Sequence, residues 1–237
     1  MSTTAALQHW LKNEMSGWRV WELGWLAFCC ISIIALSLLT GDNGVGITAA
    51  VTGTLYALFA GKGKISCYFF GIVNTVTYGL ISFEATLYGE VMLNWGWYLP
   101  MMFVGVICWR RHLDQRQIIN KTALSGRGRL IAALLSLIGI AVYANVLARL
   151  GDTSPWLDSL TTVLSVTAIV LTVKRCIEQW LLWTVVNAAS IYMWYLLYRT
   201  GSGSVAGLLM WCIALANGII FFVQWSKEER SCRPTPP

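Results

Sequence analysis

Eight apolar stretches, each long enough to cross a lipid bilayer, constrain this chain more than any other feature. They occupy approximately residues 22–40, 45–60, 65–83, 90–109, 130–149, 156–173, 178–198 and 204–225. A membrane-spanning helix needs about 20 mostly apolar residues, and its backbone groups must be hydrogen-bonded within the segment. The first stretch lacks a small-residue cleavage site, so we expect a retained helix and not a signal peptide. The sequence therefore predicts an all-α polytopic membrane protein with eight transmembrane helices.

The composition excludes a water-soluble enzyme. Only 12% of the 237 residues are charged and 57% are hydrophobic, whereas soluble domains carry about 25% charged residues. The 13 Trp and nine Tyr residues are typical of chains that meet both bilayer interfaces. The net charge of +6 comes from loops between apolar stretches. We therefore expect the protein to lie in a lipid bilayer and to have no nucleic-acid partner.

The Lys and Arg residues support the number of spans and predict the orientation. If the chain crosses the membrane eight times, all of them except Arg149 and Arg199 fall on one side. That side holds Lys12, Arg19, Lys62, Lys64, Arg110, Arg111, Arg116, Lys121, Arg127, Arg129, Lys174, Arg175, Lys227, Arg230 and Arg233. By the positive-inside rule, both termini are expected to be cytoplasmic.

A shift of the chain by 113 residues aligns spans two to four with spans six to eight without gaps, and pairs Asn74 with Asn187. One linker span separates the two units, so both enter the membrane in the same orientation, as in parallel transporter repeats. The alternative is that apolar helices resemble one another by composition. The predicted division is an N-terminal segment with an extra helix (1–44), a first three-helix unit (45–109), a basic loop with the linker helix (110–155), a second three-helix unit (156–226) and a C-terminal tail (227–237).

Polar residues line one face of the seventh span. Trp183, Asn187, Ser190 and Trp194 are spaced i, i+4, i+7 and i+11, which places them together on an α-helix. An unpaired amide in hydrocarbon is costly, so Asn187 and its repeat counterpart Asn74 should face protein or a wet cavity. Hydrogen bonding between helices is the alternative for each residue. Together they favour a ligand cavity.

Other spans add candidates for the same cavity. Tyr78 lies beside the face of Asn74, and Glu90 and Asn94 share a face near the start of the fourth span. Glu90 could instead be an interfacial carboxylate that stabilises its helix, and Asn217 in the eighth span could join helices. Pro100 is expected to kink the fourth span.

Several motifs of enzymes are missing from the sequence. It contains no G-x-x-x-x-G-K-[ST], H-E-x-x-H or G-x-S-x-G motif, and no Asp, Glu, His, Lys or Arg lies near the middle of a span. We therefore predict no catalytic residue, no metal site and no cofactor. Neutral amides with aromatic rings suit a small solute, aromatic or sugar-bearing, that moves down its own gradient.

Three motifs occur in order along the chain. They are Trp21-Glu22-Leu23 with Trp25, Leu87-Tyr88-Gly89-Glu90 through Asn94 to Tyr98-Leu99-Pro100-Met101, and Trp183-x-x-x-Asn187-x-x-Ser190-x-x-x-Trp194. Together they resemble the PnuC family of bacterial nicotinamide riboside transporters, and the resemblance covers nearly the whole chain.

The resemblance implies a three-plus-one-plus-three arrangement similar to SWEET sugar transporters, with the first span as an addition. It implies facilitated diffusion of nicotinamide riboside across the inner membrane, followed by trapping through a cytosolic riboside kinase. Carried onto this chain, it implies substrate contacts at Asn74, Asn94, Trp183 and Asn187, with Glu90, Tyr78 and Asn217 as further candidates. The pyridinium ring is a cation that aromatic faces attract, and a nucleotide phosphate would need a nearby basic residue. We therefore expect exclusion of the mononucleotide.

Two departures from symmetry predict a single asymmetric site. Phe70 stands where the repeat would match Trp183, and Gly207 stands where it would match Asn94. Gly203-x-x-x-Gly207 would allow close helix contact within the chain or in a homo-oligomer. The functions left open are a uniporter of a sugar or another vitamin and a membrane receptor or scaffold that does not transport.

Overall fold

The computed structural model describes residues 14, 16–41, 43–84, 86, 88–114, 117–200 and 205–232. Within these ranges all regular structure is helical, apart from two isolated β-bridges. The chain forms two compact units, Met1–Asn120 and Lys121–Pro237. Some residues that entered the sequence predictions lie outside the described ranges: Lys12, Leu87, Arg116, Gly203 and Arg233.

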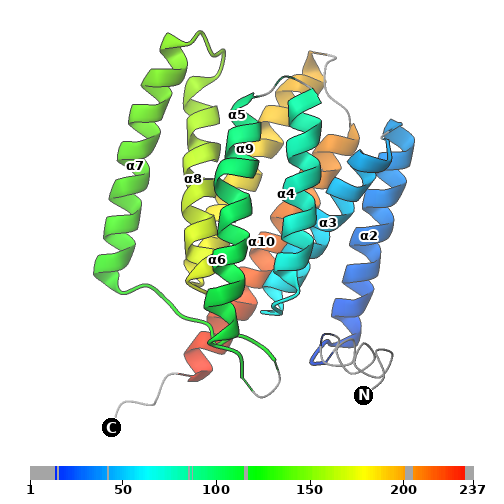
Figure 1. Ribbon diagram of the computed structural model, residues 1–237, viewed down its shortest axis with the longest axis vertical. Helices are drawn as coiled ribbons and strands as arrows, with labels where there is room; N and C mark the ends of the chain where they lie inside the picture. The colour runs from blue at the N-terminus through cyan, green and yellow to red at the C-terminus, as the bar shows by residue number, and fades with distance from the viewer. Residues whose placement is uncertain are drawn as a thin grey trace. The chain divides into compact units, whose positions relative to one another are not determined.

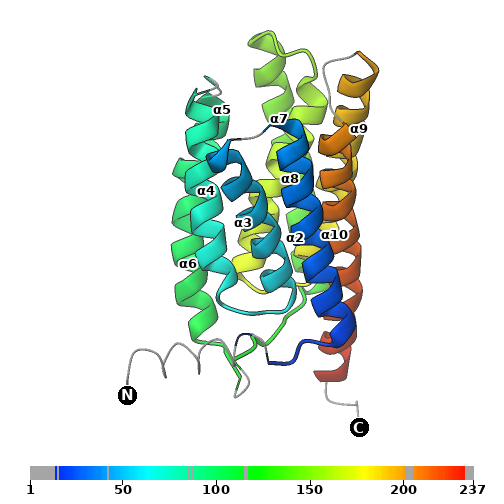
Figure 2. The ribbon, with the colours of Figure 1, turned by 90° about the vertical axis from the view of Figure 1, so that its right-hand side faces the viewer.

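The first unit contains four long helical segments. They are α2 (Val20–Thr40), α3 (Gly44–Gly61), α4 (Cys67–Glu84) and a continuous run of α5 (Tyr88–Val91), η1 (Met92–Tyr98) and α6 (Leu99–Arg110). Figure 2 shows α2, α3 and α4 running alongside one another, and α6 also packs against α4. The connection from α2 to α3 is short because Gly41 takes a left-handed conformation after α2 and the Asn43 side chain caps α3.

The second unit contains α7 (Gly126–Arg149), α8 (Pro155–Val173), α9 (Glu178–Arg199) and α10 (Val205–Cys232) (Figure 1). Helix α8 packs against α7 and α9, and α9 packs against α10. Polar bonds join α7 to α8: Ser159 Oγ donates to Ile140 O at 2.7 Å, and the hydroxyls of Ser136 and Thr167 lie 3.3 Å apart. Hydroxyl groups of this kind commonly join helices in a membrane.

Each predicted apolar stretch coincides with one of these helical segments, although α4 begins two residues after the predicted start at 65 and residue 204 lies outside the described ranges. The all-α polytopic class is confirmed. Six segments of the described chain are long and apolar enough to span a membrane: α2, α3, Tyr88–Arg110, α7, α8 and Leu208–Ser231 of α10. Helices α4 and α9 fall outside this set, and they carry Asn74 and Asn187. Helix α10 extends past the predicted end at 225 because its last turns are polar and need no bilayer. Eight crossings and the three-plus-one-plus-three arrangement stay predictions.

The turn after α3 and the turn after α8 have the same hydrogen-bond pattern. In each turn a residue with positive φ, Gly63 (69°) or Arg175 (62°), donates its N–H to the carbonyl three residues earlier. The next residue, Lys64 or Cys176, donates to the carbonyl five residues earlier, which is the Schellman motif. The paired positions differ by 112 in residue number. The gap-free shift of 113 is therefore wrong at these turns, which align with a shift of 112. The pairing of Asn74 with Asn187 needs a shift of 113, so the second unit has one more residue between its turn and its Asn than the first unit has.

Candidate functional site

Helix α9 brings Trp183, Asn187, Ser190 and Trp194 onto one face, as their spacing predicted. The helix is unbroken from Glu178 to Arg199, Asn187 and Ser190 are each 6% exposed, and the two indoles are half-buried. The Asn187 side chain has no hydrogen bond to any residue that the structure describes. Asn187 is therefore placed to bind a ligand or water.

Asn217 of α10 lies close to α9. Its neighbour Gly218 approaches α9 so closely that a Cβ on the glycine would lie 2.9 Å from Thr184 Oγ1. Asn217 is buried and has an interaction partner in the structure. The two roles predicted for it, joining helices and contacting a ligand, are both compatible with this position.

In the first unit, Asn74 of α4 is bonded to the neighbouring helix. Its Nδ2 donates to the Ala49 carbonyl of α3 at 2.8 Å. Gly53 makes room for this contact, because a Cβ there would lie 2.9 Å from Nδ2. One N–H of Asn74 thus forms a hydrogen bond between helices, which was the alternative to ligand binding for this residue. Tyr78, one helical turn further along α4, is exposed and lies within electrostatic range of Glu90.

Asn94 lies in a π-helical segment, η1, that the sequence did not predict. Asn94 is 4% exposed, whereas Trp97 is 36% exposed. Asn94 keeps its contact with Glu90, but η1 closes with i→i+5 bonds, such as Leu99 N to Asn94 O, so the α-helical spacing does not carry on to Trp97. Pro100 at the start of α6 has no N–H for the carbonyl four residues earlier. This missing donor favours the wider turns just before it, where the sequence predicted only a kink.

Both N–H groups of the Asn94 amide face Glu90. The Nδ2 atom donates to the Glu90 carbonyl at 2.9 Å and lies 3.5 Å from Glu90 Oε2. Oδ1 of Asn94 accepts no hydrogen bond from the described part of the chain. Asn94 therefore presents an acceptor, which suits a hydroxyl or carboxamide donor on a ligand.

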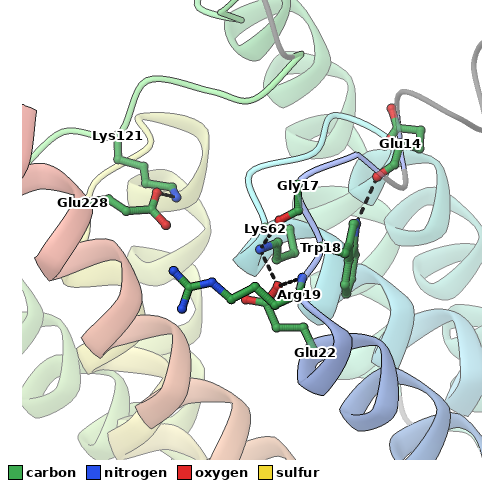
Figure 3. Close-up of polar contacts among 8 residues, drawn as sticks. All are labelled: Glu14, Gly17, Trp18, Arg19, Glu22, Lys62, Lys121 and Glu228. Atoms are coloured by element: carbon green, nitrogen blue, oxygen red, sulfur yellow. Dashed lines mark hydrogen bonds and ion pairs between the residues drawn. The ribbon is translucent and has the colours of Figure 1, made fainter.

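A cluster of polar contacts fastens the start of α2 to the turn after α3 (Figure 3). Glu22 accepts from Lys62 Nζ at 2.8 Å and from the Arg19 backbone N–H at 2.8 Å. Lys62 also donates to the Gly17 carbonyl at 3.3 Å and lies 5.6 Å from the centre of the Trp18 ring. Glu22, which belongs to the Trp21-Glu22-Leu23 motif, thus has a structural role.

Two further side-chain groups lie in the turns and loops. Lys64 is fully buried; burial lowers the pKa of its amine, and Glu14 and Asp114 oppose that shift. In the second unit, Lys121 pairs with Glu228 and lies over the Trp225 ring, and Glu178 accepts from Arg129 Nε at 2.8 Å. These ionic contacts stabilise loops, and none lies on the faces of Asn94 or Asn187.

Sequence reasoning did not select Tyr68 and Trp180. Both are buried, and the Tyr68 hydroxyl and Trp180 Nε1 have no hydrogen-bond partner within the described ranges. Each lies five residues after the positive-φ residue of its turn, so a shift of 112 would have paired them. Among the described residues no group of three His, Cys, Asp or Glu side chains could hold a metal ion.

Comparison with known proteins identifies the family. The model of the family described as "Nicotinamide mononucleotide transporter" matches residues 43–227. The nicotinamide riboside transporter PnuC of Neisseria mucosa is 36% identical over 94% of this chain and 87% of its own length. The protein of the same name from Haemophilus influenzae is 31% identical over 92% and 95%.

A solved structure agrees with these relatives. The crystal structure of the vitamin B3 transporter PnuC superimposes with a TM-score of 0.81 at 35% identity, covering 95% of this chain and 99% of that one. These relatives are named as transporters, in agreement with the expectation that the chain is not an enzyme. The chain therefore belongs to the nicotinamide mononucleotide transporter family, with the PnuC proteins, and is a multi-pass membrane transporter.

Proposed function

We propose that this protein is a uniporter that takes up nicotinamide riboside across the bacterial inner membrane by facilitated diffusion. The observation that carries the proposal is Asn187, a buried amide without a protein partner in the described chain, between two indoles on one face of α9. The names of the PnuC relatives supply the substrate.

The chemistry of the ligand fits these side chains. Nicotinamide riboside carries a pyridinium cation, ribose hydroxyls and a carboxamide. The faces of Trp183 and Trp194 would attract the cation by about 0.5–2 kcal/mol, and the Asn187 amide and Ser190 hydroxyl would bond to hydroxyls or to the carboxamide. We infer that the substrate contacts are Asn74, Tyr78, Glu90, Asn94, Trp183, Asn187, Ser190, Trp194 and Asn217.

Transport would proceed by alternating access around a midplane site, with rocking of two parallel three-helix units at 45–109 and 156–226. The matching Schellman turns after α3 and α8 support the repeat, as do Gly105 and Gly218, each of which allows a close approach to the preceding helix of its unit. The basic residues in the loops favour cytoplasmic termini. Retention of the riboside would depend on phosphorylation by a cytosolic kinase.

Uptake of labelled nicotinamide riboside into proteoliposomes that contain only this protein tests the proposal. Without ATP or an imposed ion gradient, the label should equilibrate, and Trp183→Ala or Asn187→Ala should abolish uptake in protein that still folds. Asn145→Ala is the matched control, because Asn145 is exposed on α7 and, within the described ranges, its side chain bonds to its own helix alone, at Ala141 O.

The other outcomes point to the alternatives. Folded wild-type protein that binds the riboside without flux would indicate a receptor. Uptake of a sugar or another vitamin in its place would indicate a uniporter of different specificity. Uptake unchanged in Asn187→Ala would refute the site.

A further inference from the structure

The π-helical segment Met92–Tyr98 needs support from its surroundings. Runs of π-helix are rare, and they occur mostly as short segments at functional sites. In η1 the turns lie just before Pro100, which cannot donate a backbone hydrogen bond. An irregular backbone of this kind keeps one geometry only where its neighbours determine it.

One side chain that supplies such support is Trp95, which lies in a notch on α4. The notch exists because residue 79 is glycine: a Cβ there would lie 1.9 Å from Trp95 Nε1. Nε1 also donates to the Val76 carbonyl at 3.4 Å, and the ring stacks on Phe83 at 6.4 Å and 19°. The indole thus holds η1 against α4 by shape, by a hydrogen bond and by stacking.

The residue next to this anchor is Asn94. Its two N–H groups face Glu90, and its Oδ1 is left as an acceptor. A shift of the indole would turn the backbone of η1 and redirect Oδ1, because Asn94 and Trp95 share one peptide unit. The orientation of Asn94 therefore depends on how Trp95 fits at Gly79.

We propose that Trp95 is a positioning residue: seated at Gly79, it fixes the π-helical segment so that the Asn94 acceptor faces the substrate. This inference rests on the proposed function, in which Asn94 contacts the riboside. The indole itself touches no substrate and acts through its neighbour.

A double-mutant cycle on riboside affinity tests the proposal. Gly79→Ala must displace the indole, and we expect it to weaken riboside binding by about tenfold. Gly96→Ala is the matched control within η1, because nothing lies within 4 Å of a Cβ at that position, and it should leave affinity unchanged. In an Asn94→Ala background, Gly79→Ala should cause no further loss, since the group that it misplaces is already gone.

Trp95→Phe is a second, milder variant that keeps the ring and removes the bond to Val76. We expect a smaller loss of affinity, which Asn94→Ala should again abolish. Equal losses in both backgrounds, or full affinity in Gly79→Ala, would overturn the positioning role. Full affinity in Asn94→Ala would overturn it as well. A wild-type protein that does not bind the riboside would instead count against the proposed function.

Discussion

Asn74 and Asn187 occupy matching positions in α4 and α9 under the 113-residue shift, yet only Asn74 is hydrogen-bonded within the described chain. Its Nδ2 donates to the Ala49 carbonyl at 2.8 Å, whereas Asn187 is 6% exposed and has no partner there. Two identical side chains thus have different uses. One N–H of Asn74 joins two helices and leaves the rest of its amide for the proposed substrate contact, whereas the whole Asn187 amide is available to a ligand.

This difference predicts opposite effects for the two alanine variants. Asn74→Ala removes a partly buried hydrogen bond worth about 0.5–1.5 kcal/mol, so thermal unfolding in detergent should occur at a lower temperature. Asn187→Ala should leave the unfolding temperature nearly unchanged and weaken riboside binding at least tenfold. Asn145→Ala, on the exposed side of α7, should change neither quantity. A stable Asn74→Ala with an unstable Asn187→Ala would contradict this assignment.

The Glu90 carboxylate predicts selectivity for a positively charged ring. Residues 67–109 contain no Lys, Arg or His, so Glu90 gives this stretch a negative charge close to Asn94 and Tyr78. Glu90→Gln keeps an acceptor for Asn94 and removes the charge. Uptake of the cationic riboside should fall about fivefold, and uptake of its neutral dihydropyridine form should change little.

Glu84→Gln is the control for Glu90→Gln, because Glu84 is the exposed last residue of α4 and its loss changes the net charge equally. Competition between the two labelled ribosides in proteoliposomes gives the ratio directly. An equal fall for both ribosides would assign Glu90 a structural role. Equal effects of Glu90→Gln and Glu84→Gln on uptake would show that the net charge of the surface, and not the position of Glu90, causes the selectivity.

The contacts of Lys62 predict how α2 is held to the first unit (Figure 3). The side chains of Lys62 and Glu22 are 12% and 7% exposed, and removal of one partner leaves the other charge poorly solvated. Lys62→Met or Glu22→Gln should each lower stability by about 1–3 kcal/mol. The double variant should cost less than the sum of the two, as measured by thermal unfolding. Additive losses would show that the pair contributes no coupling.

The buried Lys64 predicts a pH dependence of stability. Burial lowers the pKa of its amine below the ordinary value for lysine, against the pull of Glu14 and Asp114. At pH values between the lowered pKa of the folded protein and the ordinary pKa of the unfolded chain, the Lys64 amine is protonated to a greater extent in the unfolded chain than in the folded protein. Stability should therefore rise with pH in that alkaline window. Lys64→Met should flatten this rise in unfolding measured at stepped pH, and an unchanged slope would contradict the assignment.

The helices could be predicted from the sequence, but several contacts of the candidate site could not. Eight apolar runs predict eight helical segments because burial in hydrocarbon requires intrahelical hydrogen bonds. The π-helical turns around Asn94 escaped prediction, since helical-face reasoning assumes α geometry throughout. The bond from Asn74 to Ala49 depends on a close approach at Gly53, which periodicity does not encode. The one-residue gap between the repeats appears only in the hydrogen bonds of the two turns.

The family description names the mononucleotide, whereas the PnuC relatives are named for the riboside, and the side chains of this protein favour the riboside. A phosphate group needs cationic partners such as Arg or Lys. Residues 67–109 have none, and α9 has none before Arg199. The Glu90 charge would repel a phosphate further. Labelled mononucleotide should therefore enter proteoliposomes at least tenfold more slowly than the riboside and compete poorly with it. Equal uptake of the two compounds would refute the exclusion of the mononucleotide. Recovery of mononucleotide uptake in Glu90→Gln would show that the Glu90 carboxylate contributes to this exclusion.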